Sequence, residues 1–162
     1  MSGNPLPQAQ IVDAHLLEAD GIVFLYELTP STGGTIYLKA DDSVTWQGHS
    51  YTGTAIQIEE RKRDTDGSLS RPKVTLANPL AAFSPLVAAG SLDNALLVEK
   101  RVLRAHIDAN VNTFQARRWR IRRVLSLNRI NMSFELRDTL DGPKFLMPGR
   151  QFMPPDFPTV RL

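Results

Sequence analysis

The sequence has 162 residues, 42% hydrophobic and 22% charged, which is long and apolar enough for one globular domain with a core. It contains no cysteine, which excludes disulfides, thiolate metal sites, iron–sulfur clusters and cysteine nucleophiles. The formal net charge of +2 is too small to indicate a nucleic-acid partner by itself, although eight arginines fall within positions 101–129.

The first ten residues are polar and contain two prolines, which predicts an N-terminal arm over residues 1–10. They have neither the basic start nor the apolar core of a secretory signal. The uncharged stretch 77–92 is broken by prolines and cannot be a membrane span, so we expect no membrane contact through this chain. Apolar residues at helical spacing predict a short helix over residues 11–18.

Most of the remaining chain is predicted to form strands. Runs of β-branched and aromatic residues, or of alternating apolar and polar residues, are bounded by glycine, proline and polar turn residues. These runs cover residues 22–29, 35–38, 44–46, 50–52, 55–61, 73–77, 95–107, 114–127 and 132–136. Trp46 and Tyr51 are expected to pair across the second hairpin.

Residues 79–89 are the best candidate for a helix in the middle of the chain. Asn78 can cap it, Pro79 fits its first position, and Pro85 predicts that it is short or broken. About eight short strands with one or two short helices predict an all-β fold, mainly antiparallel, as a barrel or sandwich. We assign this domain to residues 11–150 and an extended C-terminal tail to residues 151–162.

No pattern of catalytic or metal-binding residues is present. His15, His49 and His106 lie far apart in sequence, and Asp64-x-Asp66-Gly67 lacks the further ligands of a calcium loop. A hydrolase with a dispersed site would depend only on such scattered residues. We therefore expect no enzyme activity, no catalytic residue, no cofactor and no metal ligand.

The densest charge in the sequence surrounds Trp119 and Ile121. Alternation predicts a strand with one buried and one charged side, and the paired arginines at 117–118 or 122–123 predict a β-bulge. These arginines could contact phosphates, form a seam with carboxylates of a neighbouring subunit, or pair with the chain's own acids. We place four of them at an assembly interface, namely Arg117, Arg118, Arg120 and Arg122. A nucleic-acid-binding β-barrel that uses the Arg117–Arg123 strand is the alternative.

The C-terminal segment is apolar, and its prolines favour extended backbone, so it cannot form a core of its own. It could pack on this domain or lie on a neighbouring subunit, and we favour the neighbour. The residues assigned to this assembly contact are Phe152, Met153, Pro154, Pro155 and Phe157.

An ordered series of motifs from about Val12 to Arg150 resembles the N-terminal domain of the phage minor tail protein L family. The motifs are Phe24-Leu25-Tyr26-Glu27-Leu28-Thr29-Pro30, Gly33-Gly34, Trp46-x-Gly48-x-x-Tyr51, Gly67-Ser68-Leu69-Ser70-Arg71-Pro72-Lys73-Val74-Thr75-Leu76-Ala77-Asn78, Leu97-Val98-x-x-Arg101-Val102, Phe134-Glu135-Leu136-x-Asp138 and Pro148-x-Arg150. The segment from Arg71 to Asn78 is the most specific of them.

This resemblance implies a structural role in the tail tip, or baseplate hub, of a phage with a long non-contractile tail. The implied partners are the distal tail ring protein, the central tail-tip or receptor-binding protein and the tape-measure C-terminus. It further implies a homo-oligomer, most simply a trimer, around a lumen that passes DNA without sequence-specific binding. The expected location is the virion, with assembly in the host cytoplasm. Longer members continue into a cysteine-containing iron–sulfur domain, and a chain without cysteine is expected to lack that cluster.

Overall fold

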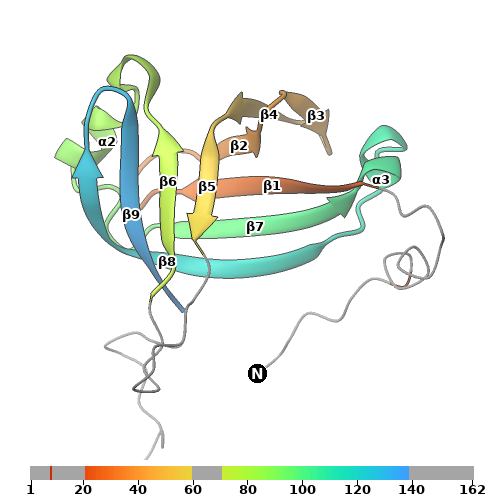
Figure 1. Cartoon of the computed structure of the whole chain (residues 1–162). Helices are drawn as coiled ribbons and strands as arrows, with labels where there is room; N and C mark the ends of the chain where they lie inside the picture. Colours follow the sequence, from red (N-terminus) through yellow and green to blue (C-terminus); the bar gives the residue numbers. More distant parts are fainter. Residues whose placement is uncertain (1–7, 9–20, 60–70, 139–162) are drawn as a thin grey trace, which may run out of the picture.

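The computed structural model describes residue 8 and residues 21–59 and 71–138 (Figure 1). The predictions for residues 11–18 and 64–68, for the N-terminal arm and for the C-terminal tail lie outside these ranges. The described strands are β1 (Ile22–Thr29), β2 (Ile36–Ala40), β3 (Val44–Trp46), β4 (His49–Thr54), β5 (Ile56–Glu59), β6 (Lys73–Ala77), β7 (Leu96–Leu103), β8 (Gln115–Leu127) and β9 (Asn131–Asp138).

All nine strands belong to one sheet, in the order β3-β4-β2-β1-β7-β8-β9-β6-β5. Every neighbouring pair is antiparallel except β2 and β4, which run parallel. Only Ala55 separates β4, near one end of this order, from β5 at the other end, and the Ala55 carbonyl accepts the N–H of Ala77. The continuous β4–β5 segment therefore joins the two ends of the sheet, which curls around its core (Figure 1). The predicted all-β, mainly antiparallel fold is confirmed.

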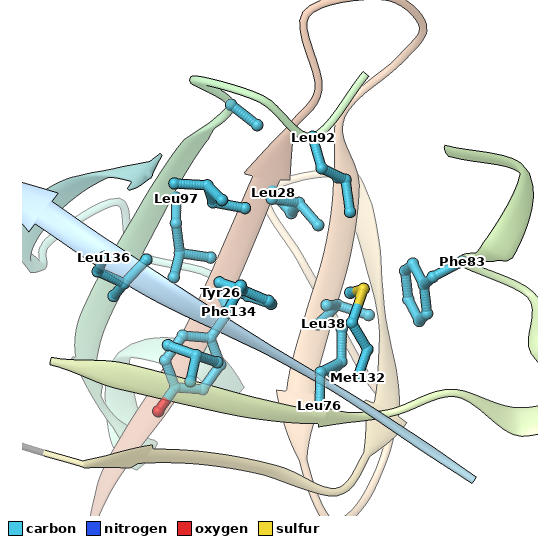
Figure 2. Close-up of a cluster of buried hydrophobic side chains, with 13 residues drawn as sticks. Tyr26, Leu28, Leu38, Leu76, Phe83, Leu92, Leu97, Met132, Phe134 and Leu136 are labelled. Atoms are coloured by element: carbon cyan, nitrogen blue, oxygen red, sulfur yellow. The ribbon is translucent and has the colours of Figure 1, made fainter. Parts of the chain in front are cut away.

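The main core fills the inside of the curled sheet (Figure 2). Leu38 of β2 and Leu28 of β1 contribute from one side, and Leu76 of β6 and Phe134 of β9 from the other. Each fully buried side chain of this size stabilises the fold by about 1.5–3 kcal/mol relative to its exposed state. Because the cluster takes residues from both ends of the strand order, its burial favours the curled shape.

A second, smaller cluster lies on the opposite face of β1 and β7. Leu25 and Val102 pack there against Trp46 and Tyr51 of the β3–β4 hairpin and against Ile107. Since β1 is covered on both faces, its sequence is apolar almost throughout instead of alternating.

Gly53 marks a close approach between strand β4 and the turn that precedes β3. A Cβ atom at this position would collide with the backbone carbonyl of Asp41 and press against the backbone of Asp42 and Ser43. The Gly53 N–H donates to Ser43 Oγ at 2.8 Å. Glycine is therefore required here for packing, whereas a Cβ at Gly34 would meet nothing within 4 Å.

The helical segments differ in detail from the predictions. The helix expected over 79–89 is broken, as predicted from Pro85, into a 3-10 turn η1 (Pro79–Ala81) and α2 (Ser84–Ala88), with Pro85 in the first turn of α2. The predicted strand 95–107 is wrong in its last part, where the chain forms α3 (Arg104–Asp108). Leu103 and Ile107 are both buried and four residues apart, a helical spacing within an otherwise strand-like sequence.

The predicted pairing of Trp46 with Tyr51 is also wrong in register. Trp46 lies opposite His49, and Tyr51 lies opposite Val44. Because the turn contains only Gln47 and Gly48, the two rings are diagonal neighbours, with centroids 6.5 Å apart.

Candidate assembly surfaces

Strand β8 divides the predicted arginine cluster between two faces of the sheet. Ile121 belongs to the main core and Trp119 packs against it, so these side chains point inward. Arg117 lies on the same inward side, next to Trp119 in a surface hollow. Arg118 and Arg120 alternate with them and point outward. The four arginines assigned to one interface are therefore not brought together on one surface.

A bulge in β8 directs two successive arginines to one carboxylate. The register against β9 shifts between Ile121 and Arg123, which confirms the predicted bulge at the 122–123 pair. Glu135 lies opposite Arg123 and accepts hydrogen bonds from Arg123 Nε at 2.8 Å and Arg122 Nη1 at 3.2 Å. Arg71 approaches the same carboxylate at 3.5 Å. These three arginines pair with an acid of the same chain.

Glu135 has a lowered pKa despite its burial. Burial acts in the opposite direction and raises this pKa, but the hydrogen bonds and charges of Arg123 and Arg122 outweigh it. The ion-pair cluster therefore stabilises the fold only while Glu135 is ionised.

Replacing Glu135 by glutamine should lower the free energy of unfolding by about 1–2 kcal/mol at pH 7, a modest value because the arginines are partly exposed. The folded pKa lies below the ordinary value of 4.5, so the contribution is complete above pH 4.5. It is lost as the pH falls through the folded pKa. Urea unfolding of Glu135→Gln and the original chain should therefore differ at pH 7 and converge in acid. Glu59→Gln, at an exposed position, is the control, and an undiminished difference in acid would contradict the assignment.

The outward side of β8 keeps an excess of positive charge. Arg120 donates to the Asn94 carbonyl at 3.1 Å, and Arg137, directly opposite Arg120, donates to Asn94 Oδ1 at 2.7 Å. Arg118 is exposed and, in the described ranges, contacts no carboxylate. This face presents the guanidinium groups of Arg118, Arg120 and Arg137, and an acidic surface would complement it.

A hollow of about 490 Å³ opens on the sheet near Trp119. Its apolar lining comes from Phe24, Tyr26, Ile58, Pro72 and Trp119, and its charged lining from Glu99, Arg101 and Arg117. Arg101 Nε donates to Glu99 Oε1 at 2.9 Å, and the Arg101 guanidinium stacks 5.3 Å from the Phe24 ring. Burial and the Glu99 charge raise the pKa of Tyr26 to about 12, so its phenol stays neutral at physiological pH.

An apolar tip lies at one end of the molecule, where the β8–β9 turn meets the η1 turn (Figure 1). Leu80 is 100% exposed and Ile130 is 79% exposed, and Leu125 and Leu127 at the end of β8 are also exposed. Leu80 has a left-handed backbone with φ of 54°, which is strained for a leucine. Exposed apolar residues on a strained loop are typical of contact sites, and we define this tip by Leu80, Leu125, Leu127 and Ile130.

Asn78 holds the two turns of the apolar tip together. Its buried amide donates to the Asn128 carbonyl at 2.7 Å and accepts the Phe83 N–H at 2.9 Å. Its backbone N–H donates to the Ile130 carbonyl at 2.8 Å. Asn78 was predicted to cap the helix that begins at Pro79, but its side chain makes no cap bond to the η1 turn. It accepts instead the N–H of Phe83, the residue before α2.

Residues 32–156 match the family described as phage minor tail protein L, which is more than half of the chain. The chain belongs to the phage minor tail protein L family. This membership confirms the resemblance drawn from the motif series and indicates a structural role in a phage tail.

This minor tail protein L family member is also similar to a chain in the solved structure of the virion of a native gene transfer agent particle. The TM-score is 0.63 at 16% identity, covering 90% of this chain and 47% of that chain. At this identity the likeness establishes a shared fold. The family member thus spans about half the length of that protein, and no curated protein matches it.

The part of this family member that the structure describes offers no metal site. Within it, no three histidine, aspartate or glutamate side chains are grouped closely enough to hold an ion. His49 stacks on Tyr37 at 4.3 Å, and His106 lies in α3. The sequence contains no cysteine that could act as a metal ligand. No helix in the described ranges is long and apolar enough to cross a membrane.

Sequence reasoning missed both the apolar tip and the hollow. Leu80 begins a short apolar run in the segment predicted to be a helix, and Ile130 is an apolar residue within a polar turn, so neither has a local signal of exposure. The hollow combines residues of β1, β5, β7 and β8 with Pro72, and no local pattern in the sequence connects them. The predicted contact residues Phe152 to Phe157 lie outside the described ranges.

Proposed function

We propose that this chain is a subunit of the tail-tip, or baseplate, hub and links the distal end of the tail tube to the central receptor-binding protein. The family match over residues 32–156 carries this proposal. The chain would act as a homotrimer around a lumen that passes DNA without sequence-specific binding. Its location would be the tail tip of the virion, after assembly in the host cytoplasm.

Two exposed surfaces support an assembly role. The apolar tip offers four large side chains that a neighbouring protein would remove from water. The outward arginines of β8 offer a positive strip for an acidic neighbour such as the distal tail ring protein or the tape-measure C-terminus. Of the four arginines assigned to the interface, Arg118 and Arg120 form this strip, Arg122 adds to it beside Glu135, and Arg117 serves a separate surface. Phe152 to Phe157 are proposed as an arm that contacts a neighbour.

Immunogold labelling of virions tests the proposed location. Antibodies against the isolated chain should label purified particles only at the tail tip, on intact tails or on partly disrupted tails that expose covered epitopes. Label along the tube, or particles that stay unlabelled after disruption, would contradict the hub assignment.

Arg118, which contacts no carboxylate in residues 21–59 and 71–138, favours one alternative, a nucleic-acid-binding β-barrel. Such a protein binds DNA or RNA with an affinity that falls steeply with salt concentration. Pairing of Arg122 and Arg123 with Glu135 weakens this alternative, because the carboxylate offsets part of the positive charge at that end of the strip. Absence of binding at low salt would exclude it.

A further inference from the structure

The hollow at Trp119 has the properties of a site for an extended, proline-rich segment. Phe24, Tyr26 and Trp119 supply aromatic walls, with Pro72 and Ile58 at their side. Aromatic-lined grooves bind proline-rich segments well, because such segments are already extended and lose little conformational entropy on binding. The hollow therefore fits a short segment of alternating prolines and large apolar side chains.

The charge of the hollow requires one anion in that segment. Arg101 is neutralised by Glu99 at 2.9 Å. Arg117 is exposed at the rim, and no carboxylate in the described ranges pairs with it. A ligand with a single carboxylate between apolar residues would complete this charge balance.

The chain itself contains a segment of this description. Residues 152–158 read Phe-Met-Pro-Pro-Asp-Phe-Pro, with Asp156 as the only charge. Seven residues with these apolar side chains cannot form a core of their own, and three prolines favour extended backbone. The hollow and this segment are thus complementary in polarity and charge.

We propose that the hollow binds residues 152–158 of a second copy of this chain, with Asp156 against Arg117 and the aromatic rings against Phe24 and Trp119. Such a contact joins two different surfaces of identical chains, and repetition with a closing rotation makes a ring. The inference builds on the proposed hub function, which requires copies to assemble symmetrically. It identifies which surface of one copy receives the arm of the next.

Cysteine cross-linking of the full chain tests this docking, because the sequence offers no other thiol. One variant carries Ile58→Cys at the hollow and another carries Thr159→Cys beside the segment. Mixing the two with a short thiol-to-thiol reagent should give a covalent dimer. The matched control replaces Ile58→Cys by Thr45→Cys, an exposed position on β3, and should give about tenfold less dimer.

Charge reversal tests the specific pair. Arg117→Glu in the hollow partner should lower the dimer yield about tenfold, and Asp156→Lys in the other partner should restore it. Arg118→Glu is the matched control, because this neighbouring arginine is equally exposed but points outward. A yield equally reduced by both reversals, or not restored by the swap, would contradict the proposed pairing.

Two further outcomes would overturn the inference. In the first, a chain that carries both cysteines links to itself while the mixed single variants stay unlinked, which would mean that the segment binds its own hollow. Absence of any cross-link at the hollow would exclude it as the site. Both outcomes are measured by cross-linking isolated chains, whereas the hub assignment is tested by labelling virions. Either proposal can therefore fail without the other.

Discussion

Replacing Glu27 by leucine should lower the free energy of unfolding by about 3–5 kcal/mol, because it breaks a largely buried ion pair. Glu27 Oε1 accepts hydrogen bonds from Lys100 Nζ at 2.6 Å and from the Tyr51 hydroxyl at 2.7 Å. The Lys100 ammonium also lies 4.7 Å from the centre of the Phe114 ring. Without the carboxylate, a confined cation and a buried hydroxyl would both lose their acceptor.

This loss should be visible in urea unfolding at pH 7 and should depend on Lys100. The double variant Glu27→Leu with Lys100→Met removes both charges and should recover most of the lost stability. Tyr51→Phe removes only the hydroxyl bond and should cost about 1 kcal/mol. If the double variant were as unstable as Glu27→Leu alone, the ion pair would not be the cause. The double variant also keeps the test possible if the single variant does not fold.

The sequence contained most of the information about the strands, because their signals are local. Bounded β-branched runs located β1, β6 and the β8–β9 hairpin. The paired arginines predicted a bulge at 117–118 or at 122–123, and the structure has it at the second position. The helix α3 was missed because its signal is one spacing of four between Leu103 and Ile107, directly after eight residues of strand. Contact of Ile107 with the second cluster favours the helical conformation of this segment, and no local sequence pattern indicates such a contact.

The candidate surfaces were less predictable than the strands for the same reason. The sequence placed Arg117 and Arg118 in one cluster, whereas strand alternation sends them to opposite faces. The pairing of Arg122 with Glu135 depends on the register of β8 against β9, which follows from the core contacts of Ile121 and Phe134. A local charge pattern therefore identified the strand but not the surface on which each arginine acts.

Asn78→Ala should destabilise the chain by about 1–3 kcal/mol, the cost of removing the partner of one buried and one partly exposed backbone group. Those groups are the Phe83 N–H and the Asn128 carbonyl, which the Asn78 amide bonds at 2.9 and 2.7 Å. Asn78→Asp keeps the acceptor for Phe83 but loses the donor to Asn128, so its loss should be intermediate. Asn112→Ala, at an exposed position, should change little.

Hydrogen exchange can locate this loss and separate it from assembly. The Phe83 amide should exchange faster in Asn78→Ala than in Asn78→Asp, and unchanged exchange at Phe83 would contradict the assigned bond. Leu80→Ser alters the apolar tip without touching Asn78, and because Leu80 is 100% exposed its stability should stay within about 0.5 kcal/mol. If the apolar tip is a contact with a neighbouring tail protein, Leu80→Ser should assemble poorly while remaining fully folded. Asn78→Ala should lose both stability and assembly, since the same amide stabilises the fold and positions the two turns of the apolar tip.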